Sequence, residues 1–248
     1  MTYCVAISVN SGIVFCSDSR TNAGIDMASV YSKMFRFDIS NERQFVVLSA
    51  GNLATSQATM HQMKKDIRLN ASVSLNTVTS LDDAADYLGE VCRMQLEKHS
   101  TSGPDFEASF LLGGQVAGSD HGVTLVYPAG NHIRSSVDTP YLQIGESKYG
   151  KPILDRIINQ NTTLETAALC ALVSMDSTMR SNLTVGPPIE VMLYTANSFV
   201  LQPYHRFEED SEFLRDLKKA WDRRLKEAFN QLPQLSWVYA NENTGNIG

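Results

Sequence analysis

Strand-like and helix-like segments are grouped along this chain of 248 residues, instead of alternating one with one. Short apolar and β-branched runs bounded by turn residues predict strands, and apolar residues at helical spacing predict helices. The predicted order is four strands, two helices, three strands, two helices and two closing strands. This grouping favours an α+β fold in which two mostly antiparallel sheets stack and helices cover both outer faces.

The predicted strands are residues 3–9, 12–16, 33–37, 44–50, 106–116, 122–127, 141–144, 189–195 and 199–201. The predicted helices are residues 53–67, 81–99, 149–158 and 164–179. Thr162 is the expected N-cap of the last of these helices, because Glu165 three residues later completes a capping box.

The last part of the chain differs in composition from the rest. We expect one domain over residues 2–203, followed at 204–248 by an amphipathic helix of about six turns and a tail. Its polar face mixes acidic and basic side chains, which favours a protein contact over a membrane surface. Packing on its own domain and contact with another subunit remain equal alternatives. The apolar face comprises Phe213, Leu214, Leu217, Trp221, Leu225 and Phe229.

Composition excludes several classes of protein. Residues are 43% apolar, enough for a sizeable core, and 27 acidic against 21 basic residues give a net charge of −6 without a basic block. Nucleic acid is therefore not an expected ligand. No apolar run approaches the roughly 20 residues of a membrane span. The five histidines and the four scattered cysteines do not have the spacing of metal ligands. We expect no metal, no cofactor, no membrane contact, and reduced thiols in a cytoplasmic protein.

Thr2 stands directly before the first predicted strand, with only Met1 in front of it and no leader expected. Removal of Met1 would leave Thr2 with a hydroxyl nucleophile and its own α-amine. That amine has a pKa of roughly 7.7 to 8.0, so it is able to act as a general base near neutral pH. A Thr after Met is common, and taken alone it does not indicate a nucleophile.

The next fifty residues change that interpretation. They hold Asp18 and Arg20 in the run SDSRTNAG, Lys33 in SKMF and Gly51 in SAGN. With Thr2 at this spacing, the sequence resembles the β-subunits of the proteasome, which are N-terminal-nucleophile (Ntn) hydrolases. Among these it is most similar to the bacterial Anbu branch, the proposed ancestral β-subunit.

The resemblance covers roughly residues 2–200 and gives the conspicuous side chains expected roles. Lys33 would lie beside Thr2, where its ammonium favours deprotonation of the neighbouring amine and hydroxyl. Asp18 would pair with Lys33 and fix its position. The backbone N–H of Gly51 would donate to the oxyanion. Each residue alone also suits an ordinary turn, surface or strand-end role, but together and behind Thr2 they favour catalysis.

Farther along, the resemblance assigns supporting residues. The family's Gly-Ser-Gly turn near the nucleophile corresponds to Gly145, Glu146 and Ser147, so Glu146 stands at the serine position. A carboxylate there would either hold the α-amine protonated or orient the substrate. The family's later Asp corresponds to Asp176, whereas its Ser falls by counting on Met179, and Ser177 or Ser181 would have to reach that place. Arg20 belongs with this supporting group.

The resemblance implies a four-layer αββα sandwich, the proteasome β-subunit fold, with an added C-terminal helix. It implies a threonine peptidase that cleaves a peptide or amide substrate inside a cytoplasmic homo-oligomer, built as stacked rings or an open spiral. A partner ATPase is not specified. Two alternatives remain open: an Ntn amidase for a small-molecule or isopeptide amide, and a catalytically silent assembly subunit in which Met1 blocks Thr2.

Overall fold

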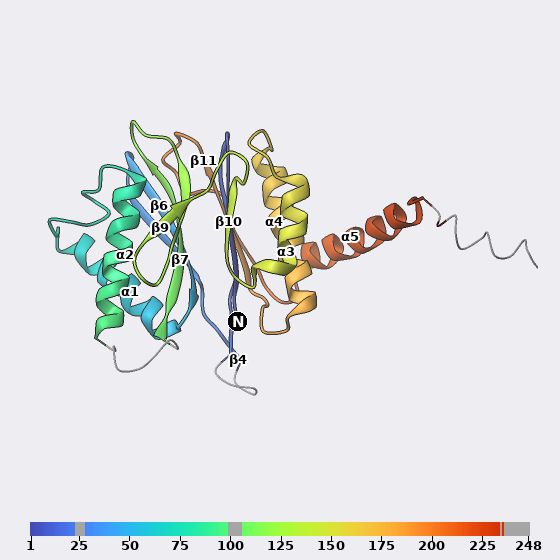
Figure 1. Ribbon diagram of the computed structural model, residues 1–248, viewed down its shortest axis with the longest axis horizontal. Coiled ribbons are helices and arrows are strands. Elements are labelled where there is room, and N and C mark those ends of the chain that lie inside the picture. The colour runs from blue at the N-terminus through green and yellow to red at the C-terminus, as the bar shows by residue number, and fades with distance from the viewer. Residues whose placement is uncertain (23–27, 99–105, 234, 236–248) are drawn as a thin grey trace, which may run out of the picture. The chain divides into compact units, whose positions relative to one another are not determined.

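The computed structural model describes residues 1–22, 28–98, 106–233 and 235, and Figure 1 shows its ribbon. The strands are β1 Tyr3–Val9, β2 Gly12–Asp18, β3 Arg20–Asn22, β4 Ala28–Val30, β5 Met34–Ser40, β6 Arg43–Gly51, β7 Ala108–Val116, β8 Gly122–Val126, β9 His132–Arg134, β10 Tyr141–Gly145, β11 Ile189–Thr195 and β12 Tyr204–Phe207. The helices are α1 Leu53–Arg68, α2 Leu81–Glu97, α3 Ser147–Ile157, α4 Leu164–Ser181 and α5 Glu212–Asn230.

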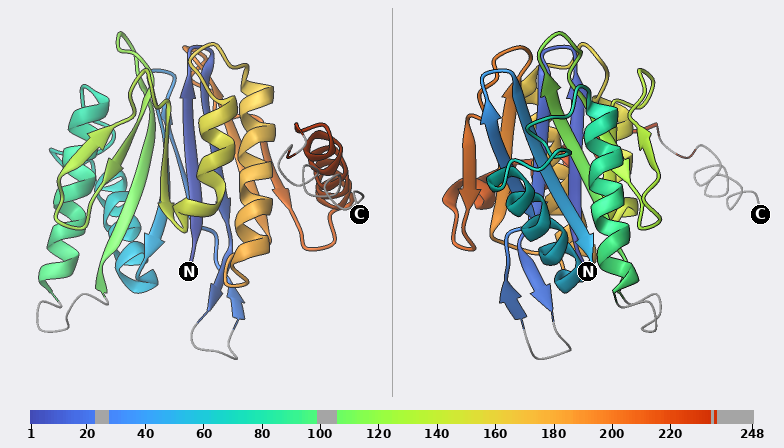
Figure 2. Two further views of the ribbon diagram at one scale, coloured as in Figure 1. Left: turned by 45° about the vertical axis from the view of Figure 1, so that its right-hand side comes forward. Right: turned by 90° about the vertical axis from the view of Figure 1, so that its left-hand side faces the viewer.

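Two five-stranded antiparallel sheets form the two middle layers of the first part of the chain. One has the strand order β10-β1-β2-β11-β12 and the other β5-β6-β7-β8-β9, while β3 and β4 form a separate pair. Helices α1 and α2 cover the outer face of the β5–β9 sheet, and α3 and α4 cover the other sheet (Figure 1, Figure 2). The predicted fold class, an α+β four-layer sandwich, is therefore confirmed.

Strands β1 and β2 lie in the centre of this sandwich, and every residue of both strands is buried. One face of each strand meets the second sheet, where Cys4, Ala6 and Phe15 pack with residues such as Leu48 and Leu111. The other face lies under α4. Because both faces are covered, the two strands read as continuous apolar runs instead of alternating ones.

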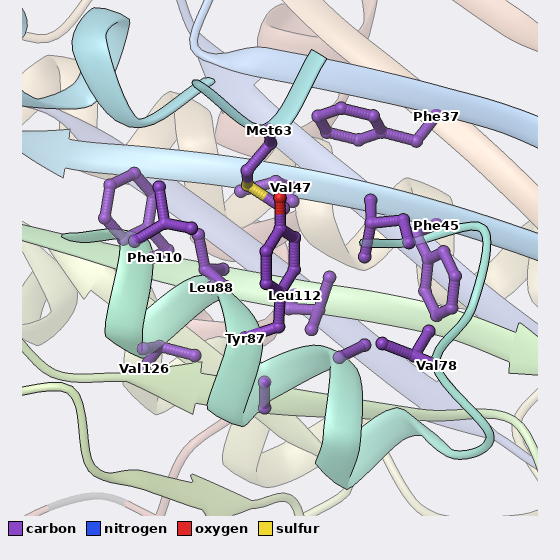
Figure 3. Packing of buried hydrophobic residues seen from close by; sticks show 14 of the residues in the cluster. Phe37, Phe45, Val47, Met63, Val78, Tyr87, Leu88, Phe110, Leu112 and Val126 are labelled. Carbon is purple, nitrogen blue, oxygen red and sulfur yellow. The ribbon is translucent and has the colours of Figure 1, made fainter. Parts of the chain in front are cut away.

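A second core fills the space between the β5–β9 sheet and its helices. Figure 3 shows Met63 of α1 and Leu88 of α2 among the aromatic and aliphatic side chains of the sheet, including Phe110 and Val126. All four cysteines are buried and free. Burial raises the pKa of the Cys92 thiol to about 11, so the protonated form predominates at neutral pH.

The chain divides into two compact units, residues 1–210 and 211–248. Strand β12 pairs with β11, and it therefore belongs to the first unit although it follows residue 203. In the second unit, the Ser211 hydroxyl caps α5 by accepting from the Leu214 N–H. None of the described residues of α5 is buried. No helix in the described part of the chain is long and apolar enough to span a membrane.

Two local predictions are wrong. No strand forms at 199–201, because Phe199 adopts a left-handed conformation with φ 49° and the ladder with β11 resumes only at Tyr204. The N-cap of α4 is Thr163 instead of Thr162: the Thr163 hydroxyl accepts from the Thr166 N–H, while the Thr162 hydroxyl accepts from the Asn159 N–H. Strands β3, β4, β9 and β12 were not predicted, since three or four residues are too short to show a period.

Candidate active site

Four strand ends meet around Thr2. Thr2 precedes β1, Lys33 precedes β5, Gly51 ends β6 and Gly145 ends β10. They share one cavity of about 300 Å³. Its lining consists of Met1, Thr2, Thr21, Lys33, Ser49, Ala50, Gly51, Leu53, Ser56, Gly145 and Glu146. Residues up to 145 positions apart in the sequence are thus brought together, because antiparallel pairing of β1 with β10 and stacking of the two sheets align these ends.

Lys33 forms a buried ion pair directly beneath this cavity. Its Nζ lies 2.6 Å from Asp18 Oδ1 and donates a second hydrogen bond to the Arg20 carbonyl at 2.6 Å. Lys33 is 5% exposed and Asp18 is fully buried. The ammonium is therefore held in one position at the cavity wall, with little freedom to leave it.

Asp18 is surrounded by hydrogen-bond donors. Besides Lys33, the backbone N–H of Tyr3 donates to Oδ1 at 3.1 Å and that of Gly186 donates to Oδ2 at 3.2 Å. Burial raises the pKa of the Asp18 carboxyl, and the Lys33 ammonium and these two N–H groups oppose the rise. Since every partner is a donor, the geometry suits the ionised carboxylate. The Tyr3 contact also ties Asp18 to the residue that follows Thr2.

Gly51 occupies a position that only glycine fits. Its φ is +106°, and a Cβ there would lie 2.4 Å from the carbonyl oxygen of Glu107, the residue directly before β7. Such a position lets the main chain at the end of β6 reach the cavity without a side chain in front of it.

The turn at the end of β10 holds the main chain of Thr2. Gly145 has φ +81°, and a Cβ there would lie 1.9 Å from the Thr2 carbonyl oxygen, to which the Glu146 N–H donates at 2.8 Å. Glu146 is the N-cap residue of α3 but its side chain makes no capping bond. Glu146 is among the residues that line the cavity and is 9% exposed. Ser147 begins α3, and its carbonyl accepts from the Gln143 side chain.

The structure does not bring all predicted site residues into the cavity. Among the described residues, the lining lacks four of the predicted ones, Asp18, Arg20, Ser147 and Asp176. Arg20 donates to the Leu183 carbonyl at 2.8 Å, and its guanidinium packs against Gly186, whose N–H donates to Asp18. Arg20 therefore supports the loop that holds Asp18. Asp176 lies half-buried in the last part of α4.

Five further residues of the lining were not singled out in the sequence: Thr21, Ser49, Ala50, Leu53 and Ser56. Thr21 follows Arg20, and Ser49 and Ala50 precede Gly51, so adjacency to the recognised motifs was the signal for three of them. Leu53 and Ser56 face the cavity from the first turn of α1, which begins two residues after Gly51. Within the described ranges, no group of three or more His, Cys, Asp and Glu residues is placed to hold a metal ion.

Comparison with known proteins agrees with this geometry. The family described as proteasome subunit matches residues 2–193. Anbu (ancestral beta-subunit) from Yersinia bercovieri is 45% identical, with 94% of this chain and 99% of that chain covered and a TM-score of 0.90. The chain belongs to the Anbu branch of the proteasome family.

Two further Anbu structures are similar over nearly the whole chain. The Anbu complex from Pseudomonas aeruginosa, solved as a helical assembly, is 42% identical with a TM-score of 0.90, and 96% of this chain and 99% of that chain are covered. Anbu from Hyphomicrobium sp. strain MC1 is 38% identical with a TM-score of 0.87, and 94% and 99% are covered. None of the curated proteins compared with the chain matches it. Membership of this family makes the sandwich a proteasome-like Ntn fold.

Proposed function

We propose that the chain is a threonine-type amidohydrolase, with the Thr2 hydroxyl oxygen as nucleophile after removal of Met1. One observation carries the proposal: Thr2, Lys33 and Gly51 line the same cavity, and a buried Asp18 holds Lys33 in place. The proposed nucleophile, the cation and the strand-end glycine thus border one cavity of about 300 Å³.

The reaction would follow from these groups. The Thr2 α-amine takes the proton from the Thr2 hydroxyl, directly or through a water, as Oγ attacks the amide carbonyl carbon. The ammonium of Lys33 disfavours a second positive charge nearby and so keeps the amine available as a base. The Gly51 N–H donates to the oxyanion, the proton passes to the departing amine, and an ester remains. Water, deprotonated by the same α-amine, then attacks the ester and releases the acid.

Supporting roles fall to the residues around this centre. Gly145 and the Glu146 N–H position the Thr2 carbonyl, and Ser147 continues that turn into α3. The Glu146 carboxylate faces the amine or the substrate from the cavity wall. Arg20 acts through the 183–186 loop, and we assign Asp176, which lies outside the cavity lining, to the support of the amine from α4.

We further propose that the chain works as a cytoplasmic homo-oligomer acting on peptide or amide substrates without a cofactor. Support comes from the P. aeruginosa relative, whose complex forms a helical assembly. The largely apolar face of α5 is available for such contacts, since Phe213, Leu225 and Phe229 are each at least half exposed.

Mass spectrometry of the intact chain tests the proposal. The mature protein should lack Met1, and a threonine-directed epoxyketone should add one adduct per chain. Thr2→Ala should abolish the adduct, whereas Thr21→Ala, which removes another hydroxyl from the same cavity, should keep it. A chain that loses Met1 and still forms no adduct would contradict the proposal and favour a silent assembly subunit. Adduct formation without cleavage of any protein would point to a small-molecule amide.

A further inference from the structure

Glu190 is a buried carboxylate that the proposed reaction does not use. It lies on β11, is 3% exposed and, within the described part of the chain, does not line the cavity. Three hydroxyl groups donate to it: Ser19 to Oε2 at 3.1 Å, Ser32 to Oε2 at 2.7 Å and Tyr204 to Oε1 at 2.6 Å. Three donors hold this buried carboxylate in one position. The chain segments that carry these donors are therefore held in place by it.

Two of these donors flank the ion pair of the site. Ser19 directly follows Asp18, and Ser32 directly precedes Lys33. The single oxygen Oε2 therefore joins the chain segment that carries the carboxylate to the segment that carries the ammonium.

Ser32 also makes a hydrogen bond to the main chain that follows Lys33. Its hydroxyl, which donates its single proton to Glu190, accepts from the Met34 N–H at 3.3 Å and so connects the carboxylate to the main chain just after Lys33. On the other segment, Ser19 and Arg20 both donate their N–H groups to the Gly186 carbonyl. Movement of Glu190 would thus be passed to both members of the pair.

The third donor anchors Glu190 from the opposite end. Tyr204 lies on β12, and the Arg36 guanidinium stacks on its ring 4.3 Å from the centroid. Burial raises the pKa of Tyr204 to about 12, so the phenol stays protonated and remains a donor at working pH. This contact fixes the carboxylate to the sheet but does not reach Asp18 or Lys33.

We propose that Glu190 is a positioning residue that sets the Asp18–Lys33 ion pair relative to Thr2 through Ser19 and Ser32. The effect on reactivity rests on the proposed function, whereas the effect on the geometry of the pair does not. Because Glu190 lies outside the cavity lining, its loss should change the rate of reaction at Thr2 and leave the binding of a ligand in the cavity unchanged.

The first arm measures reactivity in folded, full-length variants. Glu190→Gln and Ser32→Ala should each lower the maximal rate of adduct formation by the epoxyketone about tenfold, with the apparent Ki unchanged, since small misplacements of catalytic groups have effects of this size. Ser32→Thr keeps the hydroxyl and should restore the rate. Glu208→Gln on the surface should stay within about twofold. Combining Glu190→Gln with Ser32→Ala should lower the rate no further than either change alone.

The second arm does not need activity. Amide hydrogen exchange at Gly186, whose N–H donates to Asp18, should accelerate about tenfold in Glu190→Gln and not in Glu208→Gln. Unchanged exchange would overturn the proposal, and so would a wild-type adduct rate in Glu190→Gln or an unrestored rate in Ser32→Thr. If the wild-type chain itself forms no adduct, the proposed function fails and the exchange arm alone decides on Glu190. If Glu190→Gln does not fold, the Ser32 variants carry both arms.

Discussion

At the scale of single residues, burial of the Asp18–Lys33 ion pair costs free energy, and the proposed site requires the pair. Both side chains are buried, and the carboxylate depends on one ammonium and two backbone N–H groups for its solvation. Apolar replacements of a buried ion pair are often neutral or stabilising, while removal of one partner is destabilising. Retention of the pair therefore fits a need for the ammonium beside Thr2.

This reasoning predicts different outcomes for a single and a double substitution. Lys33→Ala should lower the free energy of unfolding by about 3 to 5 kcal/mol, because it leaves the Asp18 charge buried without its cation. Asp18→Asn combined with Lys33→Met should recover most of that loss and still form no epoxyketone adduct. Urea denaturation and intact mass would show both. A double variant that reacts as fast as wild type would remove Lys33 from the mechanism.

Reasoning from the sequence identified the candidate site residues that have distinctive chemistry and lie at strand ends. Thr2, Lys33 and Gly51 each follow or precede an apolar run, and all three line one cavity; their catalytic roles stay a prediction. It did not reach Glu190, whose hydroxyl partners Ser19 and Ser32 are 171 and 158 positions away in the chain. No local pattern marks such a residue, because the pairing of β11 with β2 and β12 brings Ser19 and Tyr204 to it while Ser32 comes from the segment before β5.

At the scale of secondary-structure elements, the sandwich was predictable where strands and helices are long. The buried runs of β1, β2 and β6 and the periodic helices α1, α2 and α4 all have clear signals. Helix caps and short strands were not predictable. Two adjacent threonines, Thr162 and Thr163, precede α4, and only the backbone geometry decides which one caps the helix.

The end of β6 offers an element-scale prediction. Gly51→Ala should destabilise the protein by about 3 kcal/mol or more, because the new Cβ meets the Glu107 carbonyl as well as requiring a left-handed backbone. Gly118→Ala is the matched control: its φ is +83°, but nothing lies within 4 Å of the added Cβ. That change should lower stability by only about 1 kcal/mol. Equal losses in urea denaturation would show that backbone strain alone, and not the contact with β7, excludes a side chain at 51.

At the scale of the whole molecule, two compact units have different surfaces. The first unit buries its apolar residues between its layers, whereas α5 in the second unit has no buried residue in its described part. Its apolar face was predicted from periodicity alone, but the surface that covers this face has no signature within one sequence.

Assembly through α5 is testable with a pair of neighbouring substitutions. Leu225→Glu places a charge on the exposed apolar face and should shift sedimentation toward smaller species. Lys226→Glu changes the charge of an exposed residue beside it and should leave the assembly intact. Because no described residue of α5 is buried in the single chain, both variants should melt within about 2 °C of wild type. Unchanged sedimentation of the Leu225 variant would exclude this face as the contact.

The way Thr2 is held has a practical consequence for anyone who expresses this protein. Gly145 and the Glu146 N–H fix the Thr2 carbonyl, and Met1 already lies against the cavity wall. An affinity tag or a residual protease-site scar fused in front of Thr2 would run into that cavity and convert the α-amine to an amide. Inactivity of such a preparation would describe the fusion and not the native chain, so purification handles belong at the opposite terminus.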